Sequence, residues 1–132
     1  MKKYIIWIDS LITTFSIVES GKDISYNYQD KDNANLFDNI NRGDIILGYC
    51  AEPIEKVSIM FIVKDKTSGN TLVLSKMFET AEGTTIEDKV FVSNLEEKGV
   101  VELSDTQYDM IVADMMTSRL KEIGKISRNN ND

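Results

Sequence analysis

Two triplets in the sequence place an acidic residue two positions before a lysine, a pattern that occurs in metal-dependent nucleases. They are Glu87-Asp88-Lys89 and Glu96-Glu97-Lys98. In that chemistry carboxylates hold a metal ion, and Asp65 or Glu79 could supply a further ligand. Such triplets also arise by chance in a chain with 22 acidic and 15 basic residues, and neither follows a predicted core strand at the required spacing. A metal-dependent nuclease is therefore a secondary alternative.

The residue types that the chain lacks exclude several other chemistries. It has no histidine and one cysteine, Cys50. A Ser-His-Asp or Cys-His nucleophilic site requires an imidazole, and structural zinc requires about four cysteine or histidine ligands. A lone cysteine cannot form an internal disulfide, which fits a reducing compartment, and its commonest role is that of a small buried hydrophobe. We expect no catalytic residues, no metal and no cofactor.

Length and composition favour one soluble domain. With 132 residues, the chain can bury one hydrophobic core and is too short for two ordinary domains. No apolar run approaches the roughly 20 residues of a membrane-spanning helix, and no export signal follows the N-terminal lysines. We predict a cytoplasmic monomer, with a domain over residues 1–125 and a disordered tail or the start of a linker over residues 126–132.

The net charge of −7 limits how the chain could bind nucleic acid. Neutralising phosphates normally requires a basic surface. A small basic patch beside a base pocket can still function when the acidic residues occupy the far face. We therefore expect weak affinity from this domain alone.

The N-terminal half contains three predicted strands and a short helix. Residues 4–8 form an apolar, β-branched run typical of a central strand buried on both faces, and residues 25–29 alternate so that Tyr26 and Tyr28 share one face. Asn33 could cap a helix with Leu36, Phe37 and Ile40 on its inner side. The turn at 41–44 leads into a buried strand at 45–49, and the type of segment 11–18 stays open.

The C-terminal half contains a hairpin and a closing helix. Strands at 57–63 and 71–78 flank the turn signal at 68–70, followed by a polar loop at 79–85 and short strands at 89–92 and 100–103. Ser104 and Gln107 form a capping-box pattern, and Gly124 is the predicted stop of the helix. The inner face of that helix is predicted from its helical spacing to contain Tyr108, Ile111, Val112, Met115, Met116, Leu120 and Ile123.

Three stretches in the same order resemble a known family. The stretch Asn41-Arg42-Gly43-Asp44-Ile45-Ile46-Leu47-Gly48-Tyr49, continued through Pro53 to residues 57–63, resembles the core of EVE-like domains in McrB-type restriction subunits. The first strand with Trp7 is similar to the opening of those domains, and Leu103 to Ile111 is similar to the start of their closing helix. The resemblance covers most of Lys3 to Ile123, whereas residues 79–99 match the family's loops poorly.

The resemblance implies an α/β fold of the α+β type, with a PUA-like curled β-barrel or strongly twisted sheet, flanking helices and a closing C-terminal helix. It implies a non-catalytic module that takes a modified, methylated base from double-stranded DNA into an aromatic pocket by base flipping. In McrB subunits such a domain precedes an AAA+ GTPase motor that drives the McrC nuclease. The chain contains no GxxxxGK[ST] phosphate loop, so the motor is not in this sequence.

A flipped-base pocket requires aromatic walls and a polar edge. The predicted walls are Trp7, Tyr26, Tyr28, Tyr49 and Phe78. An aromatic residue on a strand is more often a core residue, but Trp7 and Tyr49 each end a strand beside a polar turn and match the family pattern. The polar edge is assigned to Asp9, whose alternative role is a turn residue, and Ser10 and Cys50 complete the predicted pocket.

The predicted phosphate contacts are Lys22, Arg42 and Lys76, although each of them could be an ordinary solvated charge. Asp44, in the Gly-Asp turn, is interpreted as structural, because aspartate accepts hydrogen bonds from the amides of its own turn. A protein-binding adaptor of the same fold remains an alternative, and the acidic composition fits it better than it fits DNA binding.

Overall fold

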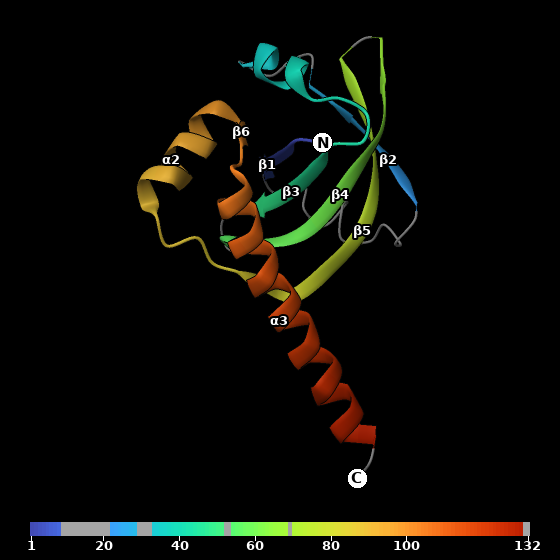
Figure 1. The fold of residues 1–132 in the computed structure, drawn as a ribbon, viewed down its shortest axis with the longest axis vertical. Helices are drawn as coiled ribbons and strands as arrows, with labels where there is room; N and C mark the ends of the chain where they lie inside the picture. Colours follow the sequence, from blue (N-terminus) through green and yellow to red (C-terminus); the bar gives the residue numbers. More distant parts are fainter. Residues whose placement is uncertain (9–21, 29–32, 52–53, 69, 131–132) are drawn as a thin grey trace.

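The computed structural model describes residues 1–8, 22–28, 33–51, 54–68 and 70–130. Their six strands form one sheet in the order β2-β5-β4-β3-β1-β6 (Figure 1). β1 and β3 are parallel and the other neighbours are antiparallel. The elements are β1 (Lys3–Ile8), β2 (Asp23–Asn27), the 3-10 helix η1 (Ala34–Asn39), β3 (Ile45–Cys50), β4 (Lys56–Thr67), β5 (Thr71–Thr84), α2 (Lys89–Lys98), β6 (Val100–Glu102) and α3 (Asp105–Asn130).

The predicted α+β class is confirmed, with a mixed sheet and flanking helices. The sheet is open, because β2 and β6 lie at opposite edges of the strand order. A closed barrel is therefore not formed by the described strands. The predictions for Asp9, Ser10, segment 11–18, Pro53 and Gly69 fall outside the described residues.

Each face of the sheet carries its own hydrophobic cluster, because side chains alternate along a strand. Tyr4, Ile6 and Ile8 of β1 pack with residues from η1, such as Phe37, on what we call the η1 face. Ile5 of β1 packs on the opposite side with residues from α2 and α3, and we call this the α3 face. Four of the six residues of β1 are fully buried. The prediction of a strand buried on both sides is confirmed.

The turn before β3 has the predicted structural aspartate. Asp44 is buried, and its two carboxylate oxygens accept hydrogen bonds from the backbone amides of Lys2 at 2.9 Å and Asn41 at 2.8 Å. Gly43 has φ +91°, a left-handed conformation that glycine adopts without steric cost. The bonds of Asp44 thus join the turn to the N-terminus beside the parallel pair β1 and β3.

The short helix before that turn differs from its prediction in type and in capping. It is a 3-10 helix, and the side chain of Asn33 makes no capping hydrogen bond. Asn33 Nδ2 instead donates to the backbone oxygen of Glu97 at 2.9 Å, which ties η1 to the end of α2. Phe37 and Ile40 are buried as predicted, whereas Leu36 is half-buried.

The predicted polar loop at 79–85 is wrong, because β5 continues to Thr84 and pairs there with Val57. Gly83 has φ +70°, and a Cβ at this position would lie 3.0 Å from the carbonyl oxygen of Val57. A close backbone approach of this kind is typical of a bulged strand, and it explains why a glycine and polar residues occur within β5.

The predicted strand at 89–92 is also wrong, because these residues begin α2. Asp88 Oδ1 accepts a hydrogen bond from the amide of Phe91 at 3.1 Å, and Gly99 ends the helix with φ +82° while its amide donates to Leu95 O at 2.7 Å. Aspartate and glycine at these two positions are the usual cap residues of a helix. The β-branched Val90 and Val92 between them gave the misleading strand signal.

The capping box of α3 is confirmed. Gln107 N donates to Ser104 Oγ at 3.1 Å, and Gln107 Oε1 accepts from Ser104 N at 2.9 Å. The predicted stop at Gly124 is wrong, because the 26-residue helix continues to Asn130. A glycine in a helix interior costs only about 1 kcal/mol relative to alanine, which the helix tolerates here.

Only the first part of α3 lies on the sheet, and the rest projects beyond it (Figure 1). Met115 is fully buried, and Tyr108, Ile111 and Val112 are half-buried. The other three predicted inner positions are exposed, with exposed fractions of 46% for Met116, 68% for Leu120 and 48% for Ile123. The three exposed residues lie on one flank of the helix, whereas Glu122, on the same side as Met115, still reaches β5 by accepting a hydrogen bond from Glu82 N at 3.1 Å. None of the described helices is long and apolar enough to span a membrane.

Candidate functional site

Three of the predicted pocket residues, Trp7, Tyr49 and Cys50, lie at the C-terminal ends of the parallel strands β1 and β3. Trp7 is the register partner of Tyr49, and Ile8 is the partner of Cys50. Because consecutive side chains point to opposite faces, Trp7 and Tyr49 lie on the α3 face, whereas Ile8 and Cys50 point to the η1 face. At this end of the sheet, the α3 face thus carries aromatic side chains, and the η1 face carries an aliphatic side chain and a thiol.

The aromatic pair on the α3 face is a packed unit. The Trp7 and Tyr49 rings are stacked, with centroids 5.2 Å apart and planes inclined by 24°. Tyr49 is 4% exposed and belongs to the α3-face cluster, and burial raises the pKa of its hydroxyl. Trp7 is half-buried, and its amide donates to Gly99 O at 2.9 Å. The predicted placement of Tyr49 in a pocket rather than the core is corrected, because its ring is enclosed by Trp7 and the apolar residues of that cluster.

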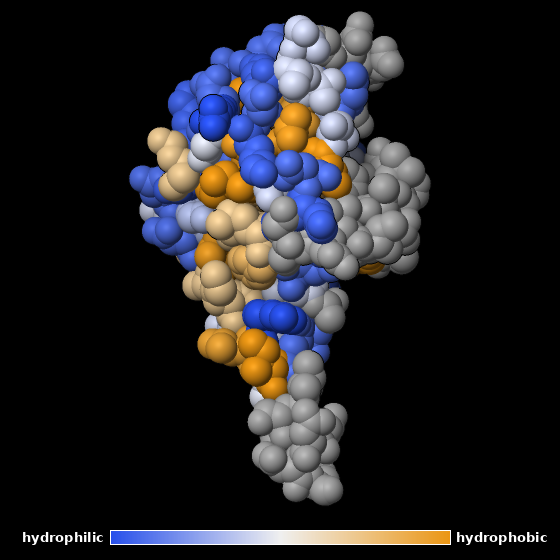
Figure 2. Space-filling view, turned by 90° about the vertical axis from the view of Figure 1, so that its right-hand side faces the viewer, coloured by the Kyte–Doolittle hydropathy of each residue, from blue (hydrophilic) through white to orange (hydrophobic). Residues whose placement is uncertain are grey.

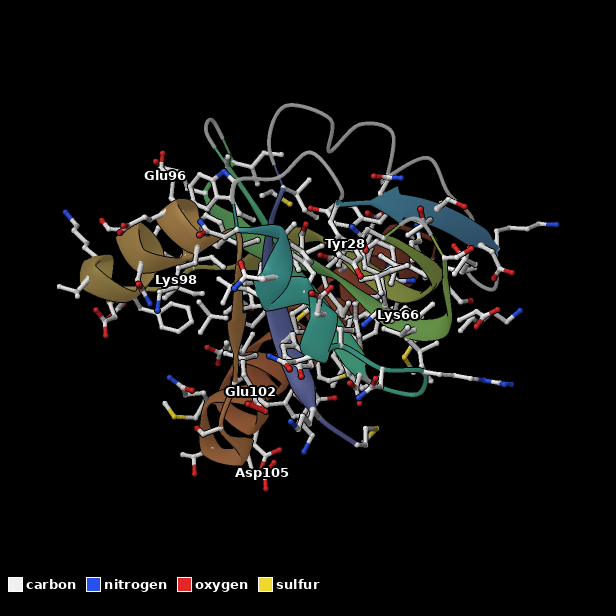
Figure 3. All side chains as sticks on the ribbon, turned by 90° about the horizontal axis from the view of Figure 1, so that it is seen from above. Tyr28, Lys66, Glu96, Lys98, Glu102 and Asp105 are labelled. Carbon is white, nitrogen blue, oxygen red and sulfur yellow. The ribbon has the colours of Figure 1, made fainter. Side chains whose placement is uncertain are left out.

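Tyr26 and Tyr28 pack on the η1 face instead. Tyr28 is fully buried, and its ring stacks on Phe37 with centroids 5.1 Å apart. The Tyr28 hydroxyl donates to Asp38 Oδ1 at 3.4 Å, and Lys66 Nζ donates to the backbone oxygen of Asp38 at 2.6 Å. Figure 3 shows Tyr28 and Lys66 on the same side of the molecule, beside η1. The ring of Tyr26 is tilted against that of Phe37, with the ring centroids 5.9 Å apart.

The five predicted wall residues are therefore divided between two faces of the sheet. Trp7, Tyr49 and Phe78 belong to the α3-face cluster, and Tyr26 and Tyr28 belong to the η1-face cluster. The structure brings Trp7 and Tyr49 together but does not bring all five rings into one pocket. The pairing of the strands decides which face each ring occupies, because alternation relates only residues of the same strand.

Polar side chains are buried on the η1 face at this same end of the sheet. Lys76 Nζ lies 3.2 Å from Glu79 Oε1, and the exposed fractions of the two side chains are 8% and 28%. Cys50 Sγ and Ser58 Oγ are 3.1 Å apart. Burial raises the pKa of the Cys50 thiol, the hydrogen bond to Ser58 opposes that rise, and the charge of Glu79 adds to it. We call Lys76, Glu79, Cys50 and Ser58 the polar cluster.

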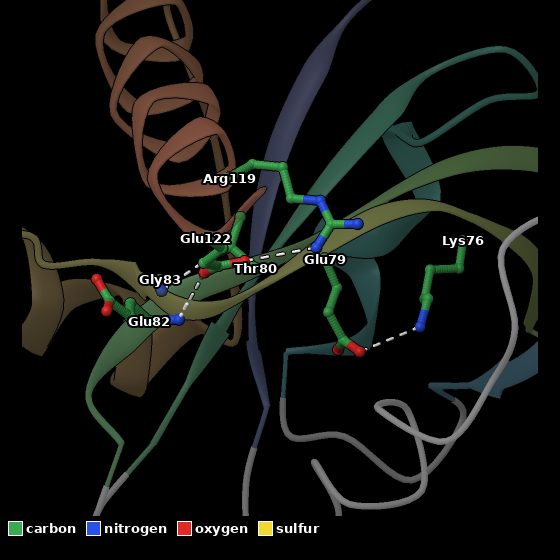
Figure 4. A network of polar contacts seen from close by, with 7 residues as sticks. All are labelled: Lys76, Glu79, Thr80, Glu82, Gly83, Arg119 and Glu122. Carbon is green, nitrogen blue, oxygen red and sulfur yellow. Dashed lines mark hydrogen bonds and ion pairs between the residues drawn. The ribbon is translucent and has the colours of Figure 1, made fainter. Parts of the chain in front are cut away.

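Lys76 was predicted as a surface phosphate contact, and this placement is corrected. Its side chain is buried and paired, and it lies on the side of β5 away from α3 (Figure 4). Lys76 pairs with Phe61 and Glu79 pairs with Ile59, and both partners belong to the η1-face cluster. Side chains opposite each other on neighbouring strands share a face. Lys76 and Glu79 therefore enter the η1 face together.

A β-bulge explains why sequence reasoning missed this pair. Residues three apart in a regular strand point to opposite faces. The register between β4 and β5 shifts between Met60 and Phe61, so β5 has one extra residue between the two ion-pair partners. Because of this extra residue, both partners point to the same face of the sheet. Met77 is that residue, and it is 47% exposed. The buried lysine has no signature in the sequence besides an i,i+3 acidic neighbour.

Of the other two predicted phosphate contacts, only Lys22 lies near the polar cluster. Lys22 is exposed and lies close to it, since its backbone oxygen accepts from Lys76 N at 3.4 Å. Arg42 is exposed in the turn before β3, whereas Cys50 ends that strand. A strand of six residues spans about 20 Å, so Arg42 lies at the far end of the sheet.

The two acidic-lysine triplets lie at opposite ends of α2. Asp88 caps the helix and Lys98 occupies its last turn, so both triplets belong to a helix rather than to the end of a core strand. Among the described residues, no three histidine, cysteine, aspartate or glutamate side chains are grouped closely enough to hold a metal ion.

Comparisons with known proteins support the fold and leave the function open. No protein-family model and no curated protein matches the chain. An NMR structure of a protein from Rhodopseudomonas palustris matches with a TM-score of 0.68 and 7% identity, covering 91% of this chain and 94% of that one. A hypothetical protein from Leishmania major matches with a TM-score of 0.65 and 11% identity, covering 90% of this chain and 97% of that one. At these identities the similarity concerns the fold alone.

Proposed function

We propose that this chain is a non-catalytic nucleic-acid-binding module that recognises a modified, methylated base flipped out of double-stranded DNA. The observation that carries the proposal is the ion pair between the buried Lys76 and the half-buried Glu79, which lies beside Cys50 and Ser58 on the η1 face. The proposal also rests on the resemblance of residues 41–63 to EVE-like domains, and it includes their PUA-like fold class.

The energetics of the pair favour a role in binding. Desolvating two charges costs about as much as their attraction returns, so a buried ion pair is often no better for stability than apolar residues of similar volume. Lys76 and Glu79 lie in β5, and the earlier residues of this strand that point to the η1 face are Leu72 and Leu74. Apolar side chains could continue that row. A ligand that uses both charges gives a reason for their presence.

The chemistry of the pair matches the edge of a nucleobase. An ammonium group donates to a base carbonyl or ring nitrogen, and a carboxylate accepts from an exocyclic amine or a ring N–H. Glu79 is the more exposed partner, with 28% of its side chain accessible, and it can meet a ligand without leaving Lys76. Ile8 and Ile59 approach each other over Gly48, where an added Cβ would lie 2.6 Å from both side chains, and they form a buried apolar layer next to the polar cluster.

The charge distribution supports a binding site at one end of the sheet. Lys22 beside the polar cluster is the nearest exposed cation among the predicted phosphate contacts, and Arg42 is too distant to join it. With a net charge of −7, most of the affinity has to come from the base itself. In the full proposal the module is a monomer in the cytoplasm and serves an AAA+ GTPase motor and a McrC-like nuclease.

The proposal is tested by measuring the affinity of the chain for DNA duplexes of one sequence. The duplexes carry methylated cytosine, hydroxymethylated cytosine, methylated adenine or no modification. We expect one modified duplex to bind at least about tenfold more tightly than the unmodified one, since discriminating base contacts contribute about 1 to 3 kcal/mol. Equal binding of all four duplexes, or none, contradicts the proposal. Cleavage of any duplex in the presence of Mg²⁺ or Mn²⁺ would favour the nuclease alternative.

A second candidate function is a protein-interaction adaptor. Met116, Leu120 and Ile123 form an exposed apolar stripe on one flank of α3, and apolar residues gather on this helix in Figure 2. Exposed apolar patches frequently mark protein interfaces, and the acidic composition suits such a role. Replacing Leu120 with aspartate should leave DNA binding unchanged if the module reads bases through the η1 face.

A further inference from the structure

A groove lies on the α3 face, on the opposite side of the sheet from the polar cluster, between α3 and the connection from β5 to α2. Its volume is about 460 Å³, within the range of small-molecule sites. It is lined by Thr84, Thr85, Ile86, Glu87, Asp88, Phe91, Leu103, Gln107, Met110, Ile111 and Asp114. The apolar stripe of α3 does not take part, because none of its three residues lines the groove.

The lining combines an apolar surface with negative charge. Ile86, Phe91 and Ile111 are half-buried and contribute flat or branched apolar side chains. Glu87, Asp88 and Asp114 are exposed carboxylates at its rim, and no lysine or arginine is among the described lining residues. None of the three carboxylates forms an ion pair within the described part of the chain.

An unsatisfied hydroxyl group lies on the same side of the sheet. Thr84 is 6% exposed and lines the groove, and its Oγ1 is buried with no hydrogen-bond partner among the described residues. Thr84 is the register partner of Val57, a member of the α3-face cluster, so its side chain is directed toward the face that bears the groove. A buried polar group without a partner is uncommon, and a bound ligand is one way to satisfy it.

From these features we infer that the groove binds a small organic cation, an ammonium group carried on an apolar or aromatic body. The carboxylates raise the local concentration of cations, the apolar lining accepts the body of the ligand, and the Thr84 hydroxyl can accept a hydrogen bond from an N–H group. The carboxylates are spread along the groove, because no three of the described acidic side chains are grouped as in a metal site. A diffuse negative field suits an organic cation better than a divalent metal ion. This site is independent of the proposed base recognition.

Three indole compounds that differ only in charge can test this inference. Tryptamine carries an ammonium group, tryptophol is its neutral analogue, and indole-3-propionate is an anion. We expect tryptamine to shift the amide resonances of Thr84, Phe91 and Ile111 at millimolar concentration, and tryptophol to bind roughly fivefold more weakly or worse. Indole-3-propionate should not bind. Equal binding of the three compounds, or no binding of tryptamine, overturns the inference, as does displacement of tryptamine by Mg²⁺ at matched ionic strength.

Variants of the lining residues locate the effect. Asp114→Asn should weaken tryptamine binding several-fold, whereas Asp109→Asn, an exposed aspartate of α3 that does not line the groove, should leave it unchanged. Thr84→Val has almost the same shape and should lower the affinity while the protein stays as stable as before or becomes more stable. Equal effects of the two aspartate variants, or an unchanged affinity in the stably folded Thr84→Val variant, would show that tryptamine binds elsewhere.

Discussion

The two faces of the sheet differ most where β1 and β3 end. On the α3 face, Trp7 and Tyr49 stack on each other as part of an apolar cluster. On the η1 face, the positions around Cys50 hold a buried lysine, a carboxylate and a hydroxyl. The aromatic side has the properties of a core, and the polar side has the properties of a site. Neighbouring residues of one strand therefore lie in different chemical environments.

The largest expected effect is a loss of stability when a covered residue of α3, rather than an exposed one, is replaced by a charged residue. Met115 is fully buried on the α3 face, so Met115→Asp should reduce the free energy of unfolding by about 3 to 5 kcal/mol, as expected for an unpaired buried charge. Leu120→Asp is the matched control. Leu120 is 68% exposed, and its replacement should change stability by no more than about 0.5 kcal/mol. Urea denaturation measures both variants, and similar losses would mean that the two positions do not differ in burial as the structure places them.

The next effect tests whether the aromatic pair is core. Tyr49→Ala should cost about 3 to 5 kcal/mol, the usual range for truncating a large aromatic core residue, because Tyr49 is 4% exposed. Trp7→Ala should cost less, because Trp7 is only half-buried. Thermal denaturation, checked by chemical denaturation, gives the stability loss of each variant. If the Tyr49 variant has native stability but no longer binds DNA, Tyr49 is a binding residue and not a core residue.

A smaller effect is expected from the close packing over Gly48 on the η1 face. An alanine Cβ at this position would lie 2.6 Å from the side chains of Ile8 and Ile59, so Gly48→Ala should cost about 1 to 3 kcal/mol. Gly43→Ala is a useful comparison, because nothing lies within 4 Å of its Cβ position and only its φ of +91° is unfavourable. If Gly48→Ala leaves both stability and DNA binding unchanged, the two isoleucines do not approach each other as described.

The smallest effect is a pH dependence that arises on the η1 face. Burial, with added contributions from Glu102 and Asp44, raises the pKa of Tyr4 from 10.0 to about 12. The folded state thus favours the protonated hydroxyl, which donates to Asn39 O at 3.1 Å. This stabilisation is complete below pH 10 and is lost as the pH rises toward about 12, with a slope of at most about 1.4 kcal/mol per pH unit.

Urea denaturation of the native chain and of Tyr4→Phe between pH 8 and pH 12 measures this dependence. The variant should show a flatter decline at alkaline pH, because it has no hydroxyl to ionise. Parallel curves for the two proteins would assign the decline to other groups, such as Tyr28 and Tyr49, whose pKa values are also raised by burial.

Local signals in the sequence predicted a large part of the fold. The apolar run of β1, the Gly43-Asp44 turn before β3 and the capping box at Ser104 each depend on residues close together in the chain, and each prediction is confirmed. The predictions failed where distant contacts decide the outcome. β5 reaches Thr84 because β4 pairs with it, and the apolar stripe of α3 remains exposed because it lies on a flank of the helix that is turned away from β5.

The candidate site was harder to predict than the fold, and one irregularity explains most of the difference. Alternation correctly indicates that Tyr26 and Tyr28 share a face, but it gives no information on which face Trp7 and Tyr49 occupy relative to them. The pairing of Lys76 with Glu79 depends on the β-bulge, which a single sequence does not reveal. Asp9, the predicted polar edge, lies outside the described residues.

The most direct test of the account replaces both members of the buried pair at once. Removing one partner alone would leave an uncompensated buried charge and unfold the protein for an uninformative reason. The double variant Lys76→Met/Glu79→Gln avoids this problem, and Asp23→Asn, which removes the exposed Lys64–Asp23 ion pair of the same sheet, is its control. For each protein, the free energy of unfolding and the affinity for the preferred modified duplex are measured on the same preparation. We predict that the double variant keeps its stability within about 1 kcal/mol and loses at least about tenfold in affinity, whereas the control changes neither. A stably folded double variant with native affinity would contradict the claim that the polar cluster of the η1 face reads the base.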